Sequence, residues 1–130
     1  MILLFDTNAF IWLAIEPRRL SKSARELCAD AHNELLLRVV SVWEIAIKVA
    51  KGSLNFPEEI SDVVEVQRQV NGVIVLPVSL AHALRVRQLP PIHQDPFDRL
   101  LIAQTQHEGA TIMTSDANIM LYNVPFAKAT

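Results

Sequence analysis

The chain has 130 residues, of which 51% are hydrophobic, 20% are charged and only three are glycine. This length and composition predict a single globular domain, residues 1–130, and exclude a disordered or low-complexity chain. The formal net charge is −2, from 14 acidic and 12 basic residues, so the charge total by itself argues against a nucleic-acid partner.

Three features of the sequence predict a cytoplasmic protein that does not enter a membrane. No apolar run approaches the roughly 18 residues that a membrane-spanning helix needs. The first residues, 1–6, have no basic region and no cleavage site, so we expect no signal peptide. Cys28 is the single cysteine, which excludes an internal disulfide and suits a reducing compartment. Its place on an apolar helical stripe predicts that it is buried.

Short apolar runs alternate with helical patterns along the whole chain. The apolar runs predict strands over residues 2–5, 35–40, 73–76, 110–114 and 124–127. The helical patterns cover residues 7–15, 21–32, 41–51, 57–71, 79–88, 95–109 and 117–121. This alternation predicts an α/β fold with a mainly parallel central sheet and helices on both faces. Such folds bind their ligands at the carboxyl ends of the strands.

Several predicted helix starts depend on capping residues. Ser41 followed by Glu44 matches the capping box, in which a serine and a glutamate three residues later bond free backbone N–H groups. Pro57 suits the first turn of the next helix. Asp95 and Pro96 predict a cap and a first-turn proline for the helix over 95–109. Single serines predict the caps of two more helices, at Ser21 and Ser79.

Four carboxylates stand at strand ends or helix starts. Asp6 follows the first strand, Glu44 and Asp98 lie in first helical turns, and Asp116 follows the strand over 110–114. A parallel sheet gathers these positions along one edge, where the carboxylates repel each other and raise each other's pKa. An oxygen ligand set without Cys or His favours Mg²⁺ or Mn²⁺ over zinc. Such a cluster suits metal-assisted cleavage of a phosphodiester.

Each of these carboxylates also has a purely structural interpretation. Asp6 and Asp95 fit the role of helix cap and nothing more. Glu44 fits a pair with Lys48, four residues further along the helix. Asp98 fits the start of a helix, where the helix dipole favours a negative charge. Asp116 fits a turn. The spacing alone leaves the structural and the metal-site interpretations open.

Four blocks of residues carry a family resemblance. They are Phe5-Asp6-Thr7-Asn8, Ser41-Val-Trp-Glu44-Ile-Ala-Ile-Lys48, His93-Gln-Asp95-Pro-Phe-Asp98-Arg-Leu-Leu-Ile-Ala-Gln104 and Thr114-Ser-Asp116. The Asp-Pro-Phe-Asp-Arg run is the most specific of them, and together the blocks span almost the whole chain. With these blocks in family order, the chain resembles the PIN-domain family, and within it the VapC-type toxin ribonucleases of type II toxin–antitoxin systems.

The resemblance implies a PIN-like three-layer fold and a Mg²⁺-dependent endoribonuclease, with Mn²⁺ as a possible substitute. The acidic quartet of the family falls on Asp6, Glu44, Asp98 and Asp116, as catalytic and metal-binding residues. Asp6 and Asp98 are then expected to hold the principal ion, and Glu44 to orient or deprotonate the attacking water. The products expected are a 5′-phosphate and a 3′-hydroxyl. Auxiliary roles fall on Asp95, Thr114 and Arg99.

The same resemblance implies three partners. These are an RNA substrate, a VapB-like antitoxin whose carboxyl-terminal segment covers the acidic groove, and a second copy of the chain in a homodimer. The net charge is then consistent with RNA binding. Without the four candidate carboxylates, ten acidic residues face twelve basic ones, so the rest of the chain is mildly basic.

Some residues carry weaker predictions. None of the four histidines shows metal-ligand spacing, and His93 is the only one with a claim to the site. Arg99 suits either a contact with phosphate or a pair with a nearby acid. Arg38 stands where family members usually carry a small polar residue, and it needs a partner if it points inward. Trp12 and Trp43 are expected to be buried or to form part of a subunit interface.

Two other functions fit part of the pattern. A Mg²⁺-dependent phosphatase or phosphoacceptor domain also has Asp after its first strand, but the phosphatase version expects a second Asp where Asn8 stands. A phosphorylated Asp6 would indicate this function. A non-catalytic binding module with a PIN-like fold is the second alternative, and absence of Mg²⁺ binding would favour it. No Gly-x-Gly-x-x-Gly run follows the first strand, which argues against a dinucleotide-binding domain.

Overall fold

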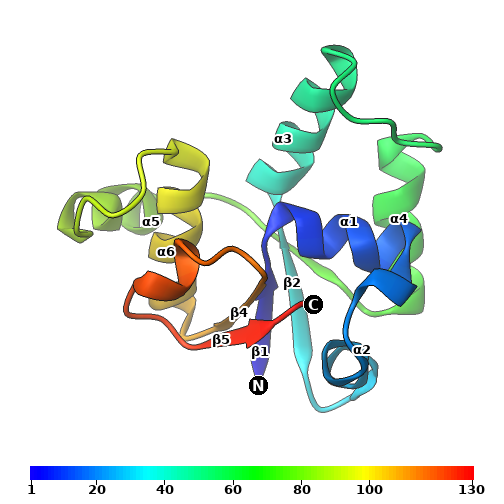
Figure 1. Ribbon diagram of the computed structural model, residues 1–130, viewed down its shortest axis with the longest axis horizontal. Helices are drawn as coiled ribbons and strands as arrows, with labels where there is room; N and C mark the ends of the chain where they lie inside the picture. The colour runs from blue at the N-terminus through cyan, green and yellow to red at the C-terminus, as the bar shows by residue number, and fades with distance from the viewer.

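Five strands form one parallel sheet in the computed structural model, which describes residues 1–130 (Figure 1). The order across the sheet is β3-β2-β1-β4-β5. The strands are β1 Ile2–Phe5, β2 Glu34–Arg38, β3 Ile74–Leu76, β4 Thr111–Thr114 and β5 Phe126–Lys128. β1 is central, since its Leu4 pairs with Leu36 of β2 on one side and with Ile112 of β4 on the other. All four pairings are parallel, which confirms the predicted α/β fold.

Helices cover both faces of this sheet. They are α1 Thr7–Ile15, α2 Lys22–Ala29, α3 Val39–Ala50, α4 Ile60–Val70, α5 Leu80–Arg85 and α6 Pro96–Glu108, with 3₁₀ turns η1 Pro17–Arg19, η2 Val86–Gln88 and η3 Ile119–Leu121. In Figure 1, α5 and α6 lie on one side of the sheet and α1, α2 and α4 on the other. No helix is both long enough and apolar enough to span a membrane.

The alternation of side chains along β1 divides the core in two. Leu3 and Phe5 belong to a buried cluster with residues of α1 and α2, among them Phe10. Leu4 points to the opposite face and belongs to a second cluster with α6, which includes Leu101. Because successive strand residues face opposite sides, a fully apolar strand of this kind requires helices on both faces. The structure therefore has the three layers that the resemblance implied.

Most predicted helix ends are confirmed. Ser21, Ser79 and Asp95 cap α2, α5 and α6 through their side chains. Gly109 ends α6 with a φ of +63°, a left-handed conformation that glycine adopts without steric cost. The predicted helix 79–88 is divided into α5 and η2, and the last predicted helix is shortened to η3.

The predicted capping box at the start of α3 is wrong. α3 begins at Val39, two residues before Ser41, and its N-cap residue Arg38 makes no side-chain capping bond. The predicted strand 35–40 therefore ends at Arg38. The Ser41 side chain is buried inside the helix, where its Oγ lies 3.1 Å from Thr7 Oγ1 of α1. The Ser41 hydroxyl therefore contacts a side chain of another helix and does not cap its own helix.

The predicted start of the next helix at Pro57 is also wrong. α4 begins at Ile60, and Pro57 is exposed in the loop before it. Leu54, Phe56 and Ile60 pack against the first core cluster. Burial of these apolar side chains directs the path of the loop, which overrides the preference of proline for a first helical turn.

Candidate functional site

A cavity of about 440 Å³ opens at the carboxyl edge of the sheet. The segments that meet there follow β1, β2 and β4, together with the start of α6. The residues that line it are Asp6, Thr7, Asn8, Trp12, Glu44, Lys48, Asp95, Asp98, Ser115, Asp116 and Ile119. All four carboxylates of the predicted quartet are therefore brought to one cavity, and Asp95 joins them.

Asp6 is both a helix cap and a residue of the cavity. Its Oδ1 accepts a hydrogen bond from the Ala9 N–H at 2.7 Å, and its Oδ2 accepts one from Thr114 Oγ1 at 2.6 Å. Only 8% of the residue is exposed. Burial raises the pKa of Asp6, the bonds from Thr114 and Ala9 oppose this shift, and the charge of Asp116 adds to it. Asp6 therefore caps a helix and lines the cavity at the same time.

Thr114 connects Asp6, which follows β1, to the turn that follows β4. Its side chain is fully buried, donates to Asp6 and accepts a hydrogen bond from the Asp116 N–H at 3.0 Å. Asp116 in turn accepts a hydrogen bond from the Asn118 N–H at 2.8 Å, which closes the turn after β4. Thr114 thereby fixes the direction of the Asp6 carboxylate and supports the turn that carries Asp116.

We expect Thr114→Val to lower the free energy of unfolding by about 2 kcal/mol, because it leaves a buried carboxylate oxygen without its donor. Urea unfolding at about neutral pH measures this loss. Thr111→Val is the matched control, since Thr111 begins the same strand and its side chain makes no hydrogen bond. Equal losses in the two variants would contradict the assigned role of Thr114.

Glu44 is held by two neighbours at the side of the cavity. Its Oε1 accepts a hydrogen bond from Thr7 Oγ1 at 2.9 Å, and its Oε2 lies 3.0 Å from Lys48 Nζ. The expected pair with Lys48 is therefore present. Thr7 belongs to the first family block, but no local pattern predicts that its hydroxyl contacts Glu44. The glutamate is thus fixed in direction before any ligand arrives.

Asp98 is the carboxylate that the site perturbs most clearly. Burial raises its pKa to about 6, and the negative charges of Asp95, Asp116 and Glu44 act in the same direction. His93 opposes this shift, because its Nε2 lies 3.0 Å from Asp98 Oδ2. Ionisation of Asp98 is therefore less favourable in this cluster than in water, and a cation bound nearby would favour it.

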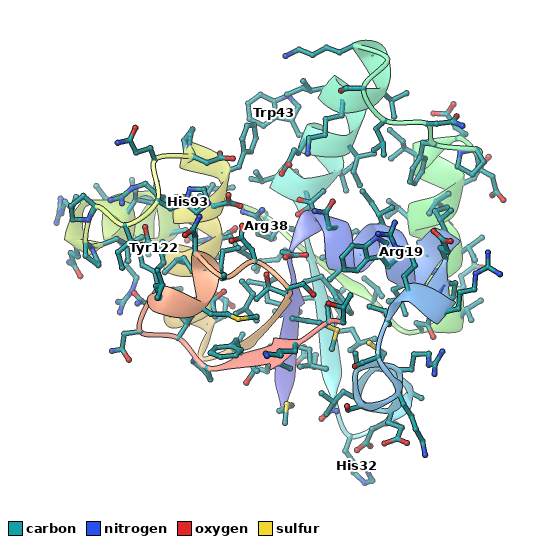
Figure 2. All side chains as sticks on the ribbon, viewed as in Figure 1. Arg19, His32, Arg38, Trp43, His93 and Tyr122 are labelled. Carbon is teal, nitrogen blue, oxygen red and sulfur yellow. The ribbon has the colours of Figure 1, made fainter.

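Arg38 supplies a buried positive charge beside the acidic cluster, and Figure 2 shows it near the centre of the molecule. Only 1% of the residue is exposed, and Nη1 donates to the Phe97 carbonyl oxygen at 3.1 Å, while Nε has no partner. Burial lowers its pKa to about 10, and the charges of Glu44, Asp98, Asp6 and Asp95 oppose that shift. Arg38 thus points inward, and its partner is a main-chain oxygen next to Asp98.

Arg99 and Asp95 have structural contacts. The Arg99 guanidinium donates to the carbonyl oxygens of Pro90, His93, Val86 and Leu89, and it does not line the cavity. It therefore orders the loop before α6 and pairs with no acid. Asp95 caps α6 through the Phe97 N–H at 2.9 Å. Its carboxylate also lines the cavity.

The two tryptophans lie in different environments. Trp12 is half-buried, packs against the first core cluster and has the Arg19 guanidinium 4.8 Å from its ring. Trp43 is 59% exposed and points away from α3 with its ring 5.4 Å from that of Phe97 (Figure 2). Burial of Trp43 within the monomer is therefore excluded. Cys28 is buried in the core, as predicted.

The donor set of the cavity fits a hard divalent cation. Five carboxylates line it, and burial, together with the charges of neighbouring carboxylates, raises the pKa values of Asp6 and Asp98. Oxygen ligands of this kind suit Mg²⁺ or Mn²⁺. Potential ligand atoms of His93, Asp98 and Asp116 lie within 4.8 Å of one another.

Comparison with known proteins places this site in a family. The model of the PIN domain matches residues 3–127, so the chain belongs to the PIN domain family. No curated protein matches the sequence significantly. PIN proteins are generally nucleases that use a divalent metal, and the acidic cavity provides ligands of the required kind.

Solved structures share the fold over almost the full length of the chain. A chain in VapBC2 of Rickettsia felis, bound to a promoter DNA fragment, has a TM-score of 0.75 and 15% identity, with 98% of each chain covered. A chain in VapBC-1 of nontypeable Haemophilus influenzae has a TM-score of 0.65 and 19% identity, again with 98% of each covered. A chain in FitAcB of Neisseria gonorrhoeae has a TM-score of 0.64 and 21% identity, covering 99% of this chain and 98% of that one.

Proposed function

We propose that the protein is a Mg²⁺-dependent endoribonuclease that acts as the toxin of a toxin–antitoxin pair. The observation that carries this proposal is the convergence of Asp6, Glu44, Asp98 and Asp116 on one cavity, with the pKa of Asp98 raised to about 6. Membership of the PIN domain family and the likeness to VapBC structures support the same function.

The four carboxylates of the quartet divide the catalytic roles in this proposal. Asp6 and Asp98 hold the principal ion, and Asp116 completes its environment. The ion, when bound, lowers the pKa of water and stabilises charge on the scissile phosphate. Glu44 orients the attacking water or accepts its proton, because Thr7 and Lys48 fix the direction of its carboxylate. Mn²⁺ can replace Mg²⁺ in such an oxygen site.

The hydrogen bonds of Asp6 support this function over a phosphoacceptor. Both of its carboxylate oxygens accept hydrogen bonds, and the residue is buried. A nucleophilic aspartate needs an oxygen that is free to approach phosphorus, whereas a metal ligand needs a fixed direction. The contacts of Asp6 therefore favour hydrolysis by water over an aspartyl-phosphate intermediate.

The products of RNA cleavage test the proposed reaction. We expect the purified protein with Mg²⁺ to leave 5′-phosphate and 3′-hydroxyl ends, because water and not the ribose 2′-hydroxyl is the nucleophile. Mapping of 5′ ends in cellular RNA after expression identifies the RNA that is cut. Products with a 2′,3′-cyclic phosphate, or equal cleavage in excess chelator, would contradict the proposed mechanism.

We also propose two protein partners. A VapB-like antitoxin covers the acidic cavity, as the likeness to VapBC and FitAcB complexes suggests. A second copy of the chain forms a homodimer through an apolar groove lined by Val39, Val40, Trp43, Val78, Pro96, Phe97 and Leu100. The exposure of Trp43 in this groove supports an interface there. The single, buried Cys28 is consistent with a cytoplasmic protein.

A further inference from the structure

Three residues at the carboxyl edge of the sheet stand in one row. The register of β1 with β2 places Arg38 at the level of Asp6. The register of β1 with β4 places Thr114 at the same level. Adjacent strands lie about 5 Å apart, and residues at one level of a parallel sheet point to the same face. Arg38 therefore begins one strand away from Asp6, on the face that α6 covers.

The Arg38 guanidinium is buried with little direct pairing. Only 1% of the residue is exposed, and Figure 2 shows it between α6 and α1. Its side chain makes one hydrogen bond, from Nη1 to the Phe97 carbonyl oxygen, and Nε has no partner. A buried charge without compensation costs free energy, and a neutral carbonyl oxygen compensates it only in part. The charge of Arg38 must therefore be balanced by groups further away.

The acidic cavity supplies this balance. The negative charges that favour the ionised form of Arg38 are those of Glu44, Asp98, Asp6 and Asp95. These four carboxylates line the cavity, whereas Arg38 is buried next to it and does not line it. Charges that interact through the protein interior are screened less than charges in water. The guanidinium and the carboxylates therefore stabilise each other without direct contact.

Burial also fixes this positive charge in place, in contrast to that of Lys48. Lys48 Nζ lies 3.0 Å from Glu44 Oε2, and 45% of the lysine side chain is exposed. A flexible, exposed ammonium can turn to solvent when another cation approaches. The Arg38 guanidinium has no such freedom, because the core surrounds it. A cation that enters the cavity therefore meets a repulsion from Arg38 that does not relax.

We propose that Arg38 is a fixed internal cation that competes with metal ions for the carboxylates of the cavity and so lowers the affinity of the site for them. This inference rests on the proposed function, because it concerns the same metal site. The other possible role is structural, in which Arg38 only ties the main chain at Phe97 to β2. Loss of a structural tie loosens the start of α6 and weakens metal binding, whereas loss of a competing charge strengthens it. The two roles thus predict effects of opposite sign.

The Mg²⁺ affinity of the full chain at about pH 8, measured by calorimetry, distinguishes the two roles. Arg38→Met removes the charge and keeps a long, unbranched side chain, so its Mg²⁺ dissociation constant should be about tenfold lower than that of the wild-type protein, or lower still. Arg38→Lys keeps the charge and should bind Mg²⁺ about as tightly as the wild-type protein. Arg25→Met is the matched control, since Arg25 of α2 is exposed and its loss changes the net charge equally.

A second neutral variant separates the charge from the hydrogen bond. Arg38→Gln keeps an N–H donor and loses the charge, so it should also bind Mg²⁺ more tightly than the wild-type protein. Thermal unfolding gives an independent readout, because an ion that binds only the folded state raises Tm. Saturating Mg²⁺ should raise Tm more in the two neutral variants than in the wild-type protein or Arg38→Lys. Backbone amide spectra show whether each variant is folded.

Three results would overturn the proposal. The first is Mg²⁺ affinity of the folded neutral variants that is equal to or weaker than that of the wild-type protein. The second is an equal gain of affinity in Arg38→Lys or Arg25→Met, since the effect would then not depend on the buried charge. The third is failure of both neutral variants to fold, which would assign Arg38 a structural role.

The same titrations separate this inference from the proposed function. Binding of Mg²⁺ by the wild-type protein without RNA cleavage overturns the ribonuclease alone. RNA cleavage by the wild-type protein, with no gain of Mg²⁺ affinity in the neutral variants, overturns the role of Arg38 alone. Failure of the wild-type protein to bind Mg²⁺ overturns both.

Discussion

Asp98→Asn is expected to reduce Mg²⁺-dependent RNA cleavage roughly a thousandfold or more while the fold is retained. Asp98 lines the acidic cavity, and its carboxylate faces the space expected to hold the cation. Loss of a charged ligand removes several kcal/mol of transition-state stabilisation, and about 4 kcal/mol corresponds to a thousandfold in rate. Asn keeps the shape of the side chain and an oxygen that can accept a hydrogen bond.

The cleavage rate of a defined RNA, measured at saturating Mg²⁺, checks this result. Asp62→Asn is the matched control, because Asp62 is an exposed aspartate in the first turn of α4, as Asp98 is in the first turn of α6. The control should cleave at the wild-type rate. Unchanged cleavage by a pure, folded Asp98→Asn sample would remove Asp98 from the catalytic site.

The same substitution should stabilise the metal-free protein at alkaline pH. The pKa of Asp98 is raised from 3.8 to about 6 by burial and by neighbouring carboxylates. Between these two values the folded state binds more protons than the unfolded state, so stability decreases as the pH rises through about 6. Asn carries no charge and avoids this loss. We expect Asp98→Asn to be more stable than the wild-type protein by about 1–3 kcal/mol at about pH 8.

Thermal unfolding in chelator at several pH values measures this difference, which is expected to be roughly 4–12 °C in Tm. It should disappear below about pH 3, because Asp98 is then protonated in both states and resembles Asn. Added Mg²⁺ should stabilise the wild-type protein far more than the variant, since only a ligand bound to the folded state stabilises it. A variant that is less stable at every pH would contradict the pKa assigned to Asp98.

The convergence of the quartet was predictable because it follows from topology. Asp6 and Asp116 come directly after strands, and Glu44 and Asp98 lie in first helical turns. A parallel sheet aligns the carboxyl ends of its strands, so positions far apart in the chain meet at one edge without knowledge of any contact. The confirmed caps, such as Asp95, were predictable for the related reason that they involve only neighbouring residues.

The contacts that refine the site were not predictable from local patterns. Ser41 matches a capping box, but a hydroxyl from α1 approaches it and α3 begins earlier. Arg99 suited a phosphate contact, but four carbonyl oxygens of the segment 86–93 accept hydrogen bonds from its guanidinium. Arg38 is paired with an oxygen 59 residues away in the sequence. In each case the partner is brought close only by the packing of separate elements.

The sequence by itself determined the alternation of strands and helices, the edge at which the acidic residues meet and the family to which they point. Those properties depend on periodicity and chain order, which are local. The tertiary structure decided which groups touch the carboxylates, and therefore their charge state and direction. Burial raises the pKa of Asp98, and hydrogen bonds from Thr114 and from the Ala9 N–H fix the direction of the Asp6 carboxylate. Both depend on distances across the fold, because electrostatic and hydrogen-bond energies change within a few ångströms.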